Sequence, residues 1–191
     1  MSFTGISAAS SNRAPEPLKP SLELSAERIL IIDDTREIHE DFRKILTKTA
    51  TKELDAVQDA LFGPGSLVHK QPHFVLDSAY QGEEGVDCLR KSLSEGLRYA
   101  LAFVDIRMPP GWDGVETVSR LWGIDPELQI VLCTAYSDYS WDELSKRLGM
   151  TDNLVILKKP FDNIEVLQLA HALTTKWLLT QKLNQRLAHS P

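Results

Sequence analysis

The stretch Ala100-Leu101-Ala102-Phe103-Val104-Asp105 is an apolar run that ends at a carboxylate, and three other apolar runs in the chain also end at polar residues. These are Ile29-Leu30-Ile31-Ile32 before Asp33-Asp34, Ile130-Val131-Leu132-Cys133 before Thr134, and Leu154-Val155-Ile156-Leu157 before Lys158-Lys159-Pro160. Continuous apolar runs of this length, bounded by polar and turn residues, are typical of strands buried on both faces of a parallel sheet. Because ligands bind outside the carboxyl ends of such strands, we expect the four polar ends to meet in one crevice.

The residue types at these four ends are suited to phosphoryl transfer. Mg²⁺ prefers hard oxygen ligands and is commonly held by one or two carboxylates together with a phosphate. An aspartate carboxylate can act as a nucleophile toward a phosphoryl group and form an aspartyl-phosphate. A lysine and a metal ion would relieve the repulsion among clustered carboxylates and would neutralise charge on the phosphoryl oxygens. The hydroxyl of Thr134 could then donate a hydrogen bond to one of those oxygens.

Each of these residues also has a purely structural interpretation. Asp33 and Asp34 could cap the following helix, because aspartate is favoured at helix N-caps. Asp105 could be a turn residue before Met-Pro-Pro, Thr134 a strand-end hydroxyl bonded to the main chain, and Lys159 a solvated charge. The presence of suitable residues at four strand ends in one chain favours the functional interpretation over four unrelated structural ones.

The order of an acidic pair, an Asp, a Thr and a Lys-Pro pair resembles the response-regulator receiver domains of two-component signalling, over about residues 28–175. The resemblance implies a CheY-like (flavodoxin-like) α/β fold, with a doubly wound, five-stranded parallel sheet in the order 2-1-3-4-5. It also implies that Asp105 is the phosphoacceptor and that Thr134 and Lys159 contact the phosphoryl group. The Lys159-Pro160 peptide is expected to be cis, as in the family.

The same resemblance implies a Mg²⁺ cofactor. Its site would consist of Asp33, Asp34, Asp105 and the main-chain carbonyl of Arg107, with Asp34 as a direct ligand and Asp33 holding a metal-bound water. The phosphoryl donor would be a cognate histidine kinase or a phosphotransfer protein. Such a domain is a signalling phosphoacceptor rather than an enzyme, and it catalyses only its own phosphorylation and dephosphorylation.

The rest of the sequence predicts additions to this domain. Residues 1–26 are rich in Ser, Ala and Pro without periodicity, which predicts a flexible tail. The receiver would occupy residues 27–175, with an insertion at 48–73 between the first helix and the second strand. Residues 176–191 would extend the last helix, which is expected to begin near Asn163 and to run beyond Leu183.

Apolar spacing indicates two further helical segments. Residues 82–97 are expected to form a helix whose inward positions are Val86, Leu89 and Leu93. Within the insertion, a longer or additional helix is indicated by Leu54, Val57, Ala60 and Leu61, and it would be closed by Gly63-Pro64-Gly65.

The predicted last helix carries a heptad-like stripe at Ala170, Leu173, Trp177, Thr180, Asn184 and Leu187. One interpretation is a coiled-coil linker that forms a homodimer or leads to an effector domain that this chain does not include. The subgroup that the chain resembles is placed N-terminal to a helical linker and a kinase or cyclic-nucleotide output domain. The alternative is that Ile164, Val166, Leu167 and Leu169 pack on the sheet and that the remainder of the helix frays.

Composition argues against several classes of protein. The net charge of −6 over 191 residues is unlike a nucleic-acid-binding surface. No apolar stretch approaches the roughly 20 residues that span a bilayer, and the N-terminus lacks the apolar core of a signal peptide. We therefore expect a cytoplasmic protein without nucleic-acid or membrane partners, in which Cys88 and Cys133 are buried free thiols. His39 is expected to lie partly exposed on the first helix.

Two other functions fit parts of the sequence. A phosphohydrolase of the haloacid-dehalogenase type also uses an Asp nucleophile and a lysine, but it needs a second Asp two residues after the nucleophile, where this chain has Arg107. A receiver that is never phosphorylated and serves as a constitutive dimerisation module would not need the complete set of acidic, hydroxyl and lysine groups. We therefore expect a phosphoacceptor that changes conformation and controls a partner or a downstream output domain.

Overall fold

Strands and helices alternate along the described chain, which comprises residues 27–47, 73–135, 139, 141–149 and 151–188 of a computed structural model. The elements are β1 (Glu27–Ile32), α1 (Arg36–Thr47), β2 (Phe74–Ala79), α3 (Gly82–Ser94), β3 (Tyr99–Asp105), α4 (Gly114–Ile124), β4 (Gln129–Thr134), α5 (Trp141–Leu148), β5 (Leu154–Lys158) and α6 (Asn163–Ala188). The predicted tail at 1–26, and the predicted insertion except His73, lie outside the described residues.

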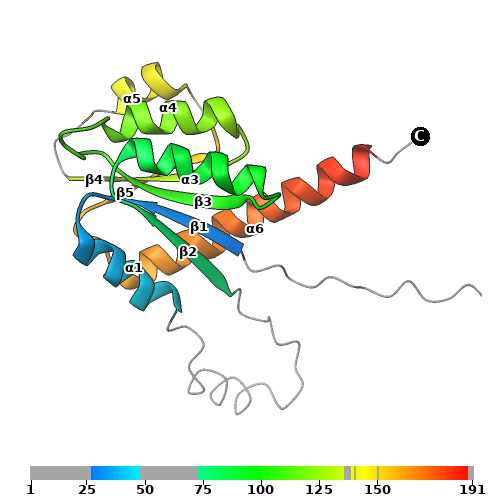
Figure 1. Ribbon diagram of the computed structural model, residues 1–191, viewed down its shortest axis with the longest axis horizontal. Coiled ribbons are helices and arrows are strands. Elements are labelled where there is room, and N and C mark those ends of the chain that lie inside the picture. The colour runs from blue at the N-terminus through cyan, green and yellow to red at the C-terminus, as the bar shows by residue number, and fades with distance from the viewer. Residues whose placement is uncertain (1–26, 48–72, 136–138, 140, 150, 189–191) are drawn as a thin grey trace, which may run out of the picture.

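The five strands form one parallel sheet in the order β2-β1-β3-β4-β5, which confirms the predicted fold class (Figure 1). The central strand β3 is buried at every position, as its continuous apolar sequence predicts. The chain first adds β2 on one side of β1 and then continues with β3 on the other side. The carboxyl ends of β1 and β3 therefore border the topological switch point, where open α/β sheets bind their ligands.

Helices cover both faces of the sheet (Figure 1). Because side chains alternate along a strand, Leu30 and Ile32 of β1 join the core under α3, α4 and α5. Ile29 and Ile31 of the same strand join the core under α1 and α6. Each face of the sheet is thus closed by apolar contacts.

Both cysteines are free thiols, as predicted. Cys133 is buried within β4, whereas Cys88 on α3 is only half-buried, so the prediction of burial is confirmed for Cys133 alone. Burial raises the pKa of both thiols, which keeps them in the neutral and less reactive form.

Helix α3 ends three residues earlier than the sequence predicts, at Ser94 rather than Leu97. Gly96 has a φ of 72°, a left-handed conformation that glycine adopts without steric cost. The main-chain N–H groups of Gly96 and Leu97 donate back to the carbonyls of Leu93 and Ser92, at 3.0 and 2.9 Å. This glycine C-cap stops the helix and turns the chain toward β3.

Helix α6 runs to Ala188, past Leu183 as predicted. The first half of the predicted heptad-like stripe covers the domain itself, because Ala170 and Leu173 are buried. These two residues belong to the core that also contains β1 and α1. The early part of the stripe is therefore occupied by the fold and is not open to a partner.

Later turns of α6 are held by polar bonds. The side-chain amides of Gln181 and Asn184 donate to Glu127, at 2.7 and 2.6 Å. The alternative in which the remainder of the helix frays is therefore wrong for these turns. That alternative also packs Ile164 on the sheet, but its side chain is 63% exposed.

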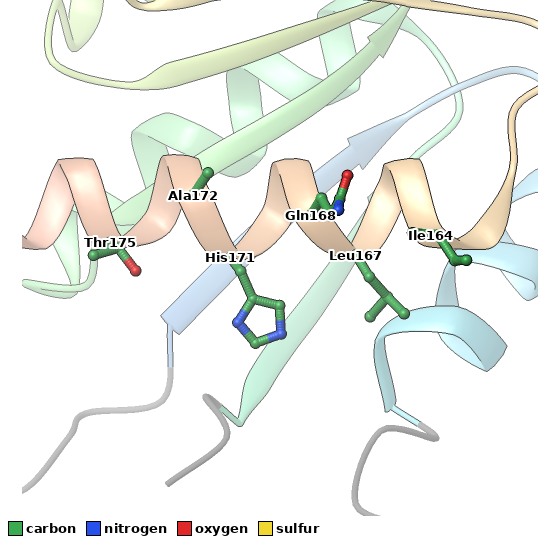
Figure 2. A pocket seen from close by; sticks show the side chains of 6 residues that line it. All are labelled: Ile164, Leu167, Gln168, His171, Ala172 and Thr175. Carbon is green, nitrogen blue, oxygen red and sulfur yellow. The ribbon is translucent and has the colours of Figure 1, made fainter. Parts of the chain in front are cut away.

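One side of α6 borders an open groove lined by Ile164, Leu167, Gln168, His171, Ala172 and Thr175 (Figure 2). The ring of His171 also packs edge-on against Phe74 of β2, with ring centroids 5.4 Å apart. The lining includes none of the site residues that the sequence predicts. Among the described helices, none combines the length and the apolar character needed to cross a bilayer.

Candidate functional site

The four polar strand ends lie along one edge of the sheet. Asp33 directly follows β1, and Asp105 is the last residue of β3. Thr134 is the last residue of β4, and Lys159 directly follows β5. These strands are consecutive neighbours in the sheet, and Asp105 pairs with Cys133, the residue before Thr134. The parallel topology therefore brings together residues up to 126 positions apart in the chain.

Lys159 joins two of the three aspartates. Its Nζ lies 2.6 Å from Oδ1 of Asp105 and 2.7 Å from Oδ2 of Asp33. The main-chain N–H of Lys159 donates to the carbonyl of Thr134 at 2.8 Å, which fixes the start of the loop after β5 against β4. The neighbouring Lys158 is exposed at the end of β5. Of the two adjacent lysines, Lys159 is thus the one that enters the crevice, as predicted.

Two peptide bonds near the crevice are cis. The Lys159-Pro160 peptide is cis, as predicted, and it follows the lysine that contacts the aspartates. The Pro109-Pro110 peptide, in the loop after β3, is also cis. Proline is the residue before which a cis peptide is common enough to be expected in a folded protein.

The three aspartates form a cluster with the chemistry of a divalent-cation site. Asp33, Asp34 and Asp105 each offer a carboxylate oxygen, and these oxygens all lie within 4.8 Å of one another. Asp33 and Asp105 are buried, whereas Asp34 is exposed. Hard carboxylate oxygens around an opening to solvent suit Mg²⁺, which binds through few protein ligands and keeps several waters. The donor set therefore fits the predicted cofactor.

Hydrogen bonds fix the carboxylates in the crevice. The main-chain N–H of Thr35 donates to Oδ1 of Asp33 at 2.9 Å, and the hydroxyl of Thr35 donates to Oδ1 of Asp34 at 3.2 Å. The main-chain N–H of Arg107 donates to Oδ2 of Asp105 at 3.1 Å. Because the lysine ammonium contacts the other oxygen, both oxygens of Asp105 have a partner. The metal-ligand role of the Arg107 carbonyl stays a prediction.

Burial and neighbouring charges shift the pKa values of Asp105 and Lys159 in opposite directions. Burial raises the pKa of Asp105, and the Lys159 ammonium opposes this rise without cancelling it. Burial would by itself lower the pKa of Lys159, but its bonds to Asp105 and Asp33 outweigh that effect and raise the pKa. The lysine is therefore held in its charged form, whereas the pKa of Asp105 stays above its ordinary value because burial outweighs the effect of the lysine.

Thr134 lies at the end of β4, half-buried at the crevice edge of the sheet. Its hydroxyl donates to the carbonyl of Ala135 at 2.8 Å. This is the strand-end bond to the main chain that the purely structural interpretation expects. A threonine hydroxyl rotates about one bond, so the same group can donate to a different acceptor when one enters the crevice.

The loop between β3 and α4 depends on Gly114. A Cβ atom at Gly114 would lie 2.3 Å from the carbonyl oxygen of Asp105 and 2.8 Å from Cα of Ile106. The main-chain N–H of Gly114 donates to the carbonyl of Ile106 at 2.8 Å. Asp113 caps α4 by accepting from the N–H of Glu116 at 2.7 Å. The start of α4 thus packs directly on the main chain of Asp105, and only glycine permits this approach.

The prediction that His39 lies partly exposed is wrong, because the residue is 1% exposed. His39 shares the inward stripe of α1 with Phe42 and Leu46, three and seven residues later, and that spacing is the sequence signal that could have placed it inside. Its Nε2 lies 2.7 Å from the carbonyl oxygen of Asp33, and its Nδ1 lies 3.0 Å from the hydroxyl of Ser78. His39 is therefore a residue at the crevice that sequence reasoning misses.

Comparison with known proteins gives a match to one family. The family model described as response regulator receiver domain matches residues 65–171, more than half of the chain. Sporulation initiation phosphotransferase F of Bacillus subtilis is 32% identical over 87 residues, which cover 46% of this chain and 65% of that relative. The matched part thus spans less than two thirds of the relative's length.

Solved structures support the fold. A CheY-like response regulator receiver domain protein from Methanospirillum hungatei superposes with a TM-score of 0.57 and 20% identity, covering 82% of this chain and 99% of that chain. A structure of adenylate cyclase from Rhodopirellula baltica gives a TM-score of 0.65 and 19% identity, covering 87% of this chain and 100% of that chain. At this level of identity, both likenesses concern the fold alone.

The close contact at Gly114 predicts opposite effects for two glycines of the same helix. Gly114→Ala should lower the free energy of unfolding by about 1–3 kcal/mol, because the added methyl group overlaps the main chain of Asp105. Gly123→Ala should raise it by about 0.5–1 kcal/mol, because a Cβ there meets nothing within 4 Å and alanine favours the helix. Urea denaturation of the two variants measures both values, and equal effects would contradict this view of the loop.

The raised pKa of Asp105 predicts a pH dependence of stability. The folded state holds the Asp105 proton more tightly than the unfolded state does. The stability associated with this residue is therefore fully present below the unfolded pKa of about 4 and is lost as the pH rises from there through the raised folded pKa. The Asp105→Asn variant has no carboxyl at this position and therefore does not lose this stability as the pH rises. In EDTA, the free energy of unfolding of the variant should increase more between about pH 3.5 and about pH 7 than the free energy of unfolding of the wild type does. A larger rise in the wild type would show that the pKa is lowered instead.

Proposed function

The chain belongs to the response regulator receiver domain family, and on this premise we propose that Asp105 accepts a phosphoryl group from a histidine kinase or a phosphotransfer protein. The receiver would comprise residues 27–175, and residues 176–191 would form a linker. The observation that carries the proposal is the pair of contacts from Lys159 to Asp105 and Asp33, at 2.6 and 2.7 Å. A lysine in this position contacts the nucleophile and would also offset the negative charge of an incoming phosphoryl group.

Mg²⁺ is the proposed cofactor, held by Asp33, Asp34, Asp105 and the carbonyl of Arg107. When bound, it supplies positive charge that offsets both the clustered carboxylates and the phosphoryl oxygens. The chain's own residues support this assignment, because the three carboxylates present oxygens within 4.8 Å of one another and one of the three opens to solvent. The buried Asp33 and Asp105 are paired with Lys159, so the exposed Asp34 is the carboxylate most accessible to an incoming ion.

The transfer step requires an ionised Asp105. One of its carboxylate oxygens forms a bond to the phosphorus of a phosphohistidine, while the phosphorus–nitrogen bond breaks and its electron pair stays on the imidazole of the donor. Lys159 favours this step by stabilising the carboxylate before transfer and the phosphoryl oxygens afterwards. The hydroxyl of Thr134 would leave the carbonyl of Ala135 and donate to the phosphoryl group. Hydrolysis by water returns Asp105 to its carboxylate, so the cycle has no other product than inorganic phosphate.

The proposed output is a conformational change passed through α6. The added phosphoryl charge would draw Thr134 and its loop toward Asp105. Lys159 contacts the crevice and begins the loop that precedes α6, so a shift of the lysine would reach the start of that helix.

The C-terminal part of α6 has an exposed apolar surface through which this change could reach a partner. Beyond residue 175 the helix exposes Leu179, Leu183 and Leu187, at 61%, 57% and 65%. Their spacing of four residues places them along one side of the helix. These leucines would face a second copy of the chain or a downstream output domain.

A constitutive dimerisation module is the second candidate. Its support is that α6 is anchored to Glu127, in the loop before β4, by the amides of Gln181 and Asn184. These bonds involve none of the crevice residues. A helix held in this way could present its leucines whether or not Asp105 is modified. The two candidates differ in whether dimerisation responds to phosphorylation.

Asp105→Asn provides the decisive variant. Incubated with acetyl phosphate and Mg²⁺, the wild type should gain the mass of one phosphoryl group, and Asp105→Asn should gain none, because its amide is not a nucleophile for this reaction. Asp113→Asn is the matched control, since it changes a nearby aspartate at a helix cap where asparagine caps equally well. Intact-mass spectrometry measures modification, and light scattering on the same samples measures dimerisation.

The outcomes separate the candidates. Labelling of the wild type and of Asp113→Asn, but not of Asp105→Asn, with a change in mass by light scattering, supports the phosphoacceptor. Dimers in all samples without labelling would support the constitutive module. Labelling of Asp105→Asn at the wild-type level would contradict the assignment of the phosphoacceptor.

A further inference from the structure

His39 is a buried polar residue that the proposed phosphoryl chemistry does not use directly. It lies on α1 and is 1% exposed. The ring of Tyr80 packs against it, with ring centroids 4.6 Å apart, and the guanidinium of Arg36 in turn covers Tyr80 at 5.1 Å from the ring centroid. The imidazole is therefore enclosed and is placed by its neighbours rather than by solvent.

The partners of His39 define the direction of both its hydrogen bonds. The carbonyl of Asp33 can only accept, so Nε2 carries a proton and donates at 2.7 Å. Nδ1 lies 3.0 Å from the hydroxyl oxygen of Ser78, which itself accepts from Arg43 at 2.8 Å. The Ser78 hydroxyl proton is thus available for Nδ1. Both ring nitrogens have a partner, and the series of hydrogen bonds links α1 and β2 to Asp33, directly after β1.

Every polar group of Asp33 has a hydrogen-bond partner. Its main-chain N–H donates to the carbonyl of Ala79 at 3.2 Å, and its two carboxylate oxygens accept from Thr35 and Lys159 at 2.9 and 2.7 Å. The remaining group is its carbonyl, which accepts from the imidazole. That carbonyl belongs to the peptide plane that joins Asp33 to Asp34. Fixing its oxygen therefore fixes the direction in which the chain enters Asp34.

Asp34 depends on this main-chain direction more than Asp33 does. Its side chain is exposed and accepts a bond from the Thr35 hydroxyl at 3.2 Å, whereas the carboxylate of Asp33 is bound at both oxygens. A carboxylate without packing of its own is oriented mainly by its main chain. We propose that His39 is a positioning residue that holds the Asp33-Asp34 peptide plane and thereby sets the carboxylate of Asp34 for binding a divalent cation.

The inference rests on the proposed function, because it assigns His39 a role toward the cation that the crevice would hold. It predicts that loss of the Nε2 donor weakens cation binding even in a folded protein. Residues that support metal ligands through such bonds typically change metal affinity by about 10–100-fold when they are removed. A merely structural role would instead lower the melting temperature and the fraction of protein able to bind, with the dissociation constant unchanged.

The test compares His39→Met with His39→Gln, two side chains of similar length of which only glutamine can donate to the Asp33 carbonyl. Isothermal titration with Mg²⁺ in the full chain gives the dissociation constant and the fraction of active sites, and thermal melting in EDTA gives the stability. His39→Met should weaken Mg²⁺ binding by about tenfold, and His39→Gln should recover most of the affinity. His73→Leu, at an exposed histidine before β2, should bind as the wild type does.

Each outcome is decisive. A wild-type dissociation constant in His39→Met would overturn the inference and leave the proposed function intact. Absence of Mg²⁺ binding by the wild type would overturn the proposed function, and the inference with it. If His39→Met does not fold, His39→Phe replaces it, because phenylalanine keeps a ring against Tyr80 but has no donor for the carbonyl of Asp33. That variant should also bind Mg²⁺ more weakly, and wild-type affinity there would equally refute the role of His39.

Discussion

The structure depends on the pairing of one lysine with clustered carboxylates. Three carboxylate oxygens within 4.8 Å of one another repel strongly wherever solvent is partly excluded. Lys159 offsets this repulsion by contacting Asp105 and Asp33 together. Burial nevertheless leaves the pKa of Asp105 above its ordinary value, so a further cation in the crevice would favour the ionised carboxylate. An acidic site that is balanced only in part is suited to reversible binding of metal and phosphoryl groups.

The sheet places two polar clusters at opposite ends of its strands. The carboxyl ends carry the crevice. At the amino ends, Arg98 precedes β3 and donates to Asp125 at 2.6 Å and to Glu127 at 3.1 Å. The same guanidinium donates to Gln181 of α6 at 2.7 Å. Helix α6 starts after the Lys159 loop and passes this second cluster. The crevice and the distal part of α6 are thus joined by one continuous helix.

The parts of this arrangement that follow from strand periodicity can be predicted from the sequence. Apolar runs that end at polar residues are enough to place four polar side chains at one edge, because parallel topology leaves little choice. His39 is harder to place, because histidine is usually exposed, although its spacing to Phe42 follows the buried stripe. The heptad-like stripe is ambiguous for a related reason, since a core-facing helix and a coiled coil share almost the same spacing. Asn184, one residue of this stripe, donates its side-chain amide to Glu127 in the loop before β4. The spacing of the stripe alone does not show this contact.

The measurement that tests the central claim most directly is the Mg²⁺ dissociation constant of Lys159→Met, determined by isothermal titration near pH 7. Because Lys159 occupies the same carboxylates as the metal would, its removal should tighten Mg²⁺ binding by about tenfold, as expected for the loss of a neighbouring positive charge. Lys158→Met, at the adjacent exposed lysine, should change the dissociation constant little. Equal or weaker binding by Lys159→Met would contradict the view that this lysine provides the balancing charge of the crevice.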